Sequence, residues 1–390
     1  MRGLSRLDRP RRVTLVASLA LVATGAAIVV FGAPAPVAVP AAPAIEEGTP
    51  HLEYVRSLPD AGDPDLLRPV GLAVADGRLY VTDSGDAVVR VFSTSGVDIG
   101  EIGRGILGVP AYIACDEATS TVLVADRQLG AVLRFSEDGE RLDDLVPSVE
   151  TTGGWEPLGV AVDGEGAVAV TDSSGRHSML VMDRDGEIAF TLGSADATGA
   201  PGSVSVALDY PNSVAFSDDE IWVSDSNNRR VLVFGRDGAF QRIIRLNGIA
   251  RGLTFLEGGE EPKTYVAVVD TIASEIVLID AEGAEVTRYG APGTSAGRLA
   301  YPNDVVYDAE TSQLFVADTA NARVQVWSVI WPSNGGAIDL DVLPVRLSPL
   351  RAFGALLAVL GLVGCAVALW PRRETPEAAI VGDALSQPDT

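Results

Sequence analysis

The 390-residue sequence has little cysteine, histidine or lysine, and each shortage excludes a class of site. Two cysteines, Cys115 and Cys365, are too few for a disulfide framework or a thiolate zinc site. Two histidines, His51 and His177, exclude most histidine-built metal centres and disfavour Ser-His-Asp chemistry. Lys263 is the single lysine, and the formal net charge is −24. A chain of this charge repels nucleic-acid backbones, so no nucleic acid is expected as a partner.

The first 33 residues combine a basic start with a long uncharged run. Residues 1–12 carry five arginines against one aspartate, and residues 13–33 carry no charge. The uncharged run is long enough to cross a hydrocarbon core of about 30 Å. A cleaved signal peptide is the alternative, because small residues follow the run, but its apolar part usually spans only about 7–15 residues. The length therefore favours an uncleaved transmembrane helix at 13–33.

A second uncharged run lies near the other end, at residues 352–370. Trp370 stands at its edge, where interfacial aromatics are common, and Arg372 and Arg373 follow. The length, the basic stop and the missing polar face favour a second transmembrane helix over a buried soluble one. Arginine at the outer flank of both runs predicts that both termini are cytoplasmic and that the middle of the chain lies outside the cytoplasm.

Between the two runs the composition divides the chain further. Residues 34–50 are rich in proline and alanine, which predicts a semi-rigid stalk without a core. Residues 332–351 form a linker, and residues 371–390 form a short cytoplasmic tail. The remaining segment, 51–331, is expected to hold the folded domain.

This middle segment contains a repeat. Six apolar runs end in aspartate, at spacings between 43 and 53 residues. The six residues are Asp83, Asp126, Asp172, Asp225, Asp270 and Asp318. Such self-similarity at a fixed period indicates a repeat architecture.

Each copy has the same internal order. An apolar run led by proline comes first in all but the fifth copy, and the run that ends in aspartate comes second. A third alternating run, a glycine-centred turn and a short fourth run follow in the first five copies. Period-two alternation between such turns predicts strands and hairpins. Four strands in a unit of this length predict a blade, and hence an all-β, six-bladed β-propeller.

The sixth copy is incomplete, because the chain has no glycine turn and no fourth run after its third strand. An additional run at residues 51–58 precedes the first copy and reads as a strand. We therefore expect the N-terminal strand to pair on the outside of the sixth blade and to close the ring. This closure would bring residues 51 and 331 together, so that both flanking segments leave the ring side by side.

The best-preserved copies, Tyr210–Arg245 and Tyr301–Trp331, share the pattern apolar-Val-x-Asp-[Ser/Thr]-x-Asn-x-Arg-Val-x-Val-[Phe/Trp]. Together with the Pro-led run and the following Gly turn, this pattern resembles NHL-repeat six-bladed propellers over about residues 51–331. Copies one to three keep the aspartate but lack Asn-x-Arg, and copy five keeps only the aspartate and the apolar frame. The resemblance implies the propeller fold. It implies no single function, because such propellers include binding platforms, sensors, lyases and lactonases.

The repeated aspartates are expected to have a structural role on one face of the disc. A carboxylate at the end of a strand can accept backbone amides of its own turn, and Asp225 and Asp318 can also pair with Arg230 and Arg323. The alternative is a ring of carboxylates that binds a cation. Because a turn explains an aspartate in every copy, the structural role is preferred.

Residues beside the leading proline are better candidates for ligand binding, because they differ between blades. The first strands line the central channel, so these side chains should surround its mouth on the face of the aspartates. The candidates are Tyr112, Asn212, Arg251, Asn303 and Asp304. The alternative is that an asparagine after proline only closes the turn that leads into the strand.

These observations favour a membrane-tethered, extracytoplasmic propeller that binds or scaffolds a protein, a peptide or a glycan. No catalytic residue and no metal site stand out, so an enzyme is the less favoured class. A cation-dependent lactonase or lyase stays open as an alternative, with Asn212, Asn303 and Asp304 as part of a divalent-cation site. No other cofactor is expected. A third alternative is the ligand-sensing subunit of a membrane signalling system.

Overall fold

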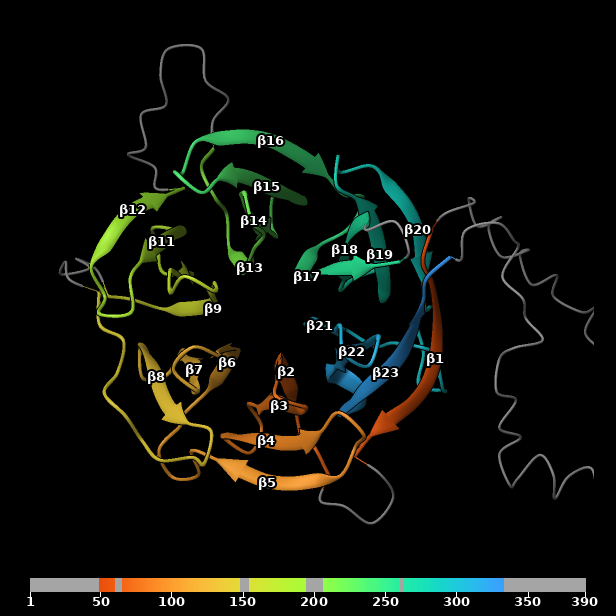
Figure 1. The fold of residues 1–390 in the computed structure, drawn as a ribbon, viewed down its shortest axis with the longest axis horizontal. Coiled ribbons are helices and arrows are strands. Elements are labelled where there is room, and N and C mark those ends of the chain that lie inside the picture. Colours follow the sequence, from red (N-terminus) through yellow and green to blue (C-terminus); the bar gives the residue numbers. More distant parts are fainter. Residues whose placement is uncertain (1–48, 60–64, 148–153, 194–205, 260–262, 333–390) are drawn as a thin grey trace, which may run out of the picture. The chain divides into compact units, whose positions relative to one another are not determined.

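The computed structural model describes residues 49–59, 65–147, 154–193, 206–259 and 263–332. These ranges form six antiparallel β-sheets that stand around a common centre as the blades of a propeller (Figure 1). The six-bladed, all-β architecture predicted from the aspartate repeat is confirmed.

The blades follow one another in sequence around the ring. Blade 1 contains β2 (Pro69–Ala75), β3 (Arg78–Asp83), β4 (Val88–Ser93) and β5 (Asp98–Ile102). Blade 2 contains β6 (Pro110–Asp116), β7 (Thr121–Asp126) and β8 (Ala131–Ser136). Blade 3 contains β9 (Pro157–Val162), β10 (Val168–Asp172), β11 (Ser178–Met182) and β12 (Ile188–Leu192). Blade 4 contains β13 (Pro211–Phe216), β14 (Glu220–Asp225), β15 (Arg230–Gly235) and β16 (Phe240–Arg245). Blade 5 contains β17 (Ala250–Gly258), β18 (Lys263–Asp270), β19 (Glu275–Asp280) and β20 (Glu285–Tyr289). Blade 6 contains β21 (Val305–Asp308), β22 (Gln313–Asp318) and β23 (Arg323–Ile330), with a short 3₁₀ turn at Thr319–Asn321 and the N-terminal strand β1 (His51–Leu58).

Aspartate, proline and glycine residues set the limits of these strands. The second strand of every blade ends at its repeated aspartate, and four of the six first strands begin at the leading proline. The turns between the third and fourth strands contain a glycine with positive φ in each of the first five blades, and a side chain would strain the backbone there. These five glycines are Gly96, Gly139, Gly186, Gly238 and Gly283.

The ring is closed by β1, which pairs antiparallel with β23 from His51↔Ile330 to Leu58↔Val324. Figure 1 shows this pairing, with β1 on the outside of blade 6. The closing strand expected from the sequence is therefore present. Leu52 and Leu58 are buried on it, at 2% and 0% exposed, so closure also completes the packing between blade 6 and its neighbours.

Blade 2 differs from the four-strand pattern expected of each copy. Its outer segment makes only two isolated bridges, Arg141 to Phe135 and Leu145 to Val132, and forms no continuous strand. Arg141 instead donates to Asp144 three residues further along, at 2.7 Å. This local ion pair and the acidic composition of the segment account for the interrupted ladder.

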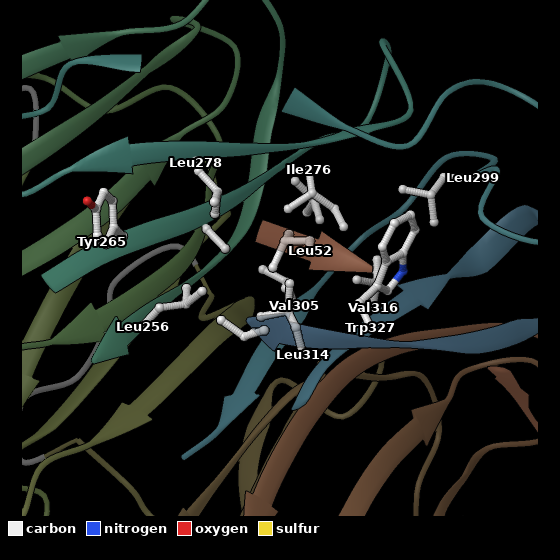
Figure 2. Close-up of a cluster of buried hydrophobic side chains, with 13 residues drawn as sticks. Leu52, Leu256, Tyr265, Ile276, Leu278, Leu299, Val305, Leu314, Val316 and Trp327 are labelled. Atoms are coloured by element: carbon white, nitrogen blue, oxygen red, sulfur yellow. The ribbon is translucent and has the colours of Figure 1, made fainter. Parts of the chain in front are cut away.

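The hydrophobic core lies between neighbouring blades. Figure 2 shows the cluster between blades 5 and 6, which contains Leu52, Leu278, Val305 and Trp327. Five more clusters lie within the described ranges, and each draws its residues from neighbouring blades. Burial of each leucine-sized side chain contributes about 1.5–3 kcal/mol, so the blades stabilise one another.

The ring has two distinct faces. The Asp-turn face holds the turns that follow the six aspartates and the segments that lead into each first strand. The Gly-turn face is opposite and holds the turns between first and second strands and between third and fourth strands. His51 and Ile330 lie at the Gly-turn end of their ladder, because β23 runs away from Asp318. The chain therefore joins and leaves the propeller on the Gly-turn face.

The described part of the chain contains no helix with the length and hydropathy of a membrane span. The transmembrane helices predicted at 13–33 and 352–370 lie outside the described residues. So do the basic N-terminus, all but the last two residues of the stalk, nearly all of the linker and the C-terminal tail.

Candidate functional site

In blades 1 to 5 the first strand leaves its partner strand at its second and third residues. In blade 1, Pro69 pairs with Asp83, but the next pair is Leu72 with Val81. The same shift occurs at the start of β6, β13 and β17. The second and third residues are thus released from the ladder, and they face the channel and the next blade.

Glycine at the third position permits this close approach. A Cβ atom at Gly71 would lie 2.5 Å from the carbonyl oxygen of Ala111, and one at Gly252 would lie 2.2 Å from Oδ1 of Asp304. Blades 2 and 6 instead carry Tyr112 and Asp304 at the third position, and both side chains are buried. Small residues in the neighbouring blades therefore leave room for two large polar side chains at the centre.

Four of the five candidate residues lie close together around this centre. The hydroxyl of Tyr112 donates to the backbone carbonyl of Asn303 at 3.0 Å, which joins blade 2 to blade 6. Arg251 of blade 5 donates to Oδ1 of Asn303. Nδ2 of Asn303 donates to the hydroxyl of Thr319 at 2.7 Å. Asn303 is thus the hub of a polar network that spans the ring, and both its Oδ1 and its Nδ2 have a partner.

Asp304 is the fourth member and is 4% exposed. Its Oδ2 accepts the backbone amide of Leu72 in blade 1 at 2.8 Å. Burial raises the pKa of the Asp304 carboxyl to about 8, because the amides of Leu72 and Val305 offset only part of the lost hydration. Burial also raises the pKa of the Tyr112 hydroxyl well above its ordinary value, and the nearby Asp304 adds to this rise.

The raised pKa of Asp304 predicts a pH-dependent stability. Between its ordinary value of 3.8 and about 8, the folded protein keeps a proton that the unfolded chain releases. The free energy of unfolding should therefore fall as pH rises through this range, because the native state binds more protons. We expect urea unfolding from pH 4 to 9 to show that wild type loses stability relative to Asp304→Asn as pH rises, because the amide cannot ionise. A difference that does not change with pH would contradict the prediction.

Asn212 does not join this network in any described contact. Its Nδ2 donates to the hydroxyl of Ser226 at 2.6 Å within blade 4, and that hydroxyl donates to the carbonyl of Ala250 in blade 5. Of the hypothetical cation ligands, Asn212 thus lies in a separate hydrogen-bond set from Asn303 and Asp304. The guanidinium of Arg251 on Oδ1 of Asn303 also repels a metal ion at that oxygen. This geometry fits a cation site poorly and fits a structural brace well.

The six repeated aspartates are buried, with at most 3% of each residue exposed. Each accepts an amide from the segment that leads into its own first strand and another from the turn that follows, or a side-chain donor there. Asp83, for example, accepts the amides of Arg68 at 2.8 Å and of Gly85 at 3.0 Å. Asp225 and Asp318 also accept Nε of Arg230 and of Arg323, at 2.6 and 2.7 Å. Their oxygens are therefore directed into the blade.

Hydroxyl groups beside these aspartates link neighbouring blades, and the sequence reasoning missed them. Thr319 donates to the carbonyl of Pro69 at 2.7 Å, and Thr271 donates to that of Pro302 at 2.8 Å. Thr82, Thr171 and Ser226 make the equivalent bonds in three other blades. Blade 2 has Ala125 and Arg127 at these positions and lacks the group. The sequence signal for these bonds was a Ser or Thr adjacent to five of the six aspartates.

A separate cavity of about 300 Å³ lies between blades 2 and 3 on the Gly-turn side. Arg134 and Arg184 line it together with Thr121 and Leu142. Arg184 is held by two bonds to Asp116, of 2.5 and 3.0 Å, and its guanidinium lowers the pKa of that carboxyl. The charges in the cavity wall are thus partly neutralised. None of the residues selected from the sequence lines this cavity.

The fold recurs in solved structures of low sequence identity. An auxiliary nutrient binding protein from Bacteroides thetaiotaomicron matches with a TM-score of 0.55 and 14% identity, over 68% of this chain and 70% of that one. A second protein from the same organism, described as of unknown function, matches at 0.54 and 15%, over 73% and 76%. A luciferin-regenerating enzyme matches at 0.52 and 14%, over 73% and 98%. At these identities the similarity concerns the fold alone.

No curated protein sequence matches the chain. The model of the NHL repeat matches residues 208–234, which run from the end of the segment before β13 into β15. This match covers the first two strands and nearly all of the third in one of the two best-preserved copies, the one that contains Asp225 and Arg230. The chain therefore contains an NHL repeat within a six-bladed β-propeller.

Proposed function

We propose that this chain is a membrane-tethered binding module whose propeller lies outside the cytoplasm and holds a polypeptide partner. The observation that carries the proposal is the pairing of His51 with Ile330, which places both connections to the propeller on the Gly-turn face. Uncharged runs at 13–33 and 352–370 flank these connections in the sequence. Two tethers on one face leave the Asp-turn face free to meet a partner.

The channel mouth supports binding rather than catalysis in this proposal. Tyr112, Arg251, Asn303 and Asp304 bond to one another or to the backbone, so they brace blades 1, 2, 5 and 6. A brace of this kind makes the ring rigid, and a rigid scaffold lowers the entropic cost of binding. The specificity of the module then lies in the loops of its exposed face.

The topology can be tested with alkaline phosphatase, which is active only after export from the cytoplasm. A fusion after Thr390 should be inactive, because the proposal places the C-terminus inside. A matched fusion to a chain truncated at Asn334 should be active, because it ends before the second uncharged run. Activity in the Thr390 fusion, or inactivity in the truncated one, would refute the two-anchor arrangement.

A further inference from the structure

The two faces of the propeller differ in the exposed charges that form no ion pair. On the Gly-turn face, every turn between a first and a second strand has an exposed carboxylate at or beside it. These residues are Asp76, Glu117, Glu165, Asp218, Glu257 and Glu310. None of the six forms an ion pair within the described ranges. Lys263 is the one exposed cationic side chain near these turns in the part of the chain that the structure describes.

The Asp-turn face presents arginine instead. Arg68 leads into β2, Arg127 follows Asp126, Arg229 lies in the turn after β14, and Arg245 ends β16. All four are exposed, and none makes an ion pair with a residue that the structure describes. The repeated aspartates of this face are buried beneath their hydrogen-bond donors. The repeated aspartates therefore do not compete with an acidic ligand for these guanidinium groups.

Exposed apolar side chains stand among these arginines. Leu67 is 58% exposed, Leu129 48%, Ile272 58% and Tyr301 59%. Leu67 adjoins Arg68 in sequence, and Leu129 lies two residues after Arg127. Exposed apolar groups rimmed by polar ones commonly mark interaction surfaces. Solvent-accessible carboxylates also lie on this face: Asp65 and Glu156 form no described ion pair, whereas Asp86 and Glu101 pair with Arg104, and Asp209 lies beside His177.

The first two blades join part of this surface into a continuous patch. Gly85 packs against Leu67, and its neighbour Asp86 pairs with Arg104 at 2.6 Å in the loop toward blade 2. Gly108, at the end of that loop, packs against Gln128, which lies between Arg127 and Leu129. Ile106 lies in the same loop and is 38% exposed. The apolar and basic groups of blades 1 and 2 can thus engage one ligand.

We propose that the Asp-turn face binds a partner polypeptide through a segment that alternates acidic and apolar residues. Arginine recognises carboxylates through paired N–H donors, and the leucines supply apolar area. A polyanion without apolar groups is disfavoured for two reasons. The net charge of −24 repels it at a distance, and such a ligand would leave Leu67 and Leu129 exposed to solvent. This inference rests on the proposed function in one respect, because that proposal places the Asp-turn face away from the membrane.

The test uses the full chain in neutral phosphatidylcholine nanodiscs and three fluorescent peptides of equal length. One alternates Glu with Leu, one Glu with Ser, and one Lys with Leu. We expect the Glu-Leu peptide to bind at least about tenfold more tightly than the other two, with an affinity that falls as salt is added. Equal binding of the Glu-Ser peptide would indicate a polyanion site and overturn the proposal. Preference for the Lys-Leu peptide, or no binding by Glu-Leu, would overturn it as well.

Matched variants assign the binding to the face. Replacing Arg68, Arg127, Arg229 and Arg245 by serine should weaken Glu-Leu binding about tenfold or more, because four guanidinium groups are lost. The control Lys263→Glu, Ala118→Glu and Ala281→Glu lowers the net charge by the same amount on the Gly-turn face and should change binding by less than about twofold. Equal weakening in both variants would overturn the assignment to this face.

Thermal unfolding of both variants verifies that they keep the fold. The phosphatase fusions report membrane topology independently of these peptides.

Discussion

Deleting residues 51–58 is expected to abolish the stable folded state. The deletion removes every ladder bond between β1 and β23 and takes the buried side chains of Leu52 and Leu58 from the core. Two buried leucines alone contribute roughly 3–6 kcal/mol, a large part of the about 5–15 kcal/mol that stabilises a typical domain. The loss also exposes the edge of β23, which favours aggregation. Circular dichroism and size-exclusion chromatography of the fragment 49–332 with and without the strand measure the effect.

Complementation provides the control for this deletion. A synthetic peptide with residues 49–59 should restore the folded signal, because it supplies the missing strand and both leucines. The same peptide with Leu52→Asp and Leu58→Asp should not, since it would bury two carboxylates. If the deleted fragment unfolds at the same temperature as the intact one, β1 does not close the ring.

Replacing Asp318 with alanine should lower the free energy of unfolding by about 3–5 kcal/mol, the usual cost of removing one partner of a buried ion pair. Asp318 is 0% exposed and accepts the amide of Ala300 at 2.6 Å and Nε of Arg323 at 2.7 Å. It also accepts Nδ2 of Asn321 and Nε2 of Gln325, each at 2.8 Å. The variant leaves all four donors without this acceptor, and Gln325 is itself fully buried. Urea unfolding measures the change.

Asp218→Ala is the matched control for this substitution. Asp218 is exposed on the Gly-turn face, and no described hydrogen bond or ion pair involves its carboxylate. Its replacement should change the free energy of unfolding by less than about 0.5 kcal/mol. A similar loss in both variants would mean that the repeated aspartate does not anchor its turn.

The fold could be predicted because its determinants recur along the sequence. Each blade needs an acceptor after its second strand, and that need repeats Asp83, Asp126 and their counterparts at a nearly constant spacing. The glycine turns require positive φ, which few other residues adopt, so they also recur. The interrupted ladder of blade 2 was not predicted. The apolar pattern of a short outer strand is weak, and the local bond between Arg141 and Asp144 competes with pairing.

The positions of the candidate residues were predicted in part, and their role in ligand binding stays a prediction. Position beside the leading proline correctly selected residues that lie around the centre of the ring, because the backbone shift there occurs in blade after blade. The contact of Tyr112 with Asn303 joins residues far apart in sequence and depends on closure of the whole ring. No local pattern encodes it. For the same reason the sequence does not reveal that Gly252 makes room for Asp304, because these two residues lie in neighbouring blades.

The position of the two propeller ends has a mechanical consequence. His51 and Ile330 face each other at one end of a single ladder, so forces that pull these residues apart load one residue pair at a time and unzip β1 from β23. Forces that draw both ends in the same direction load the ladder evenly and leave it intact. The ring therefore resists force when the segments before His51 and after Ile330 are pulled in the same direction. It opens at blade 6 when these two segments are pulled apart.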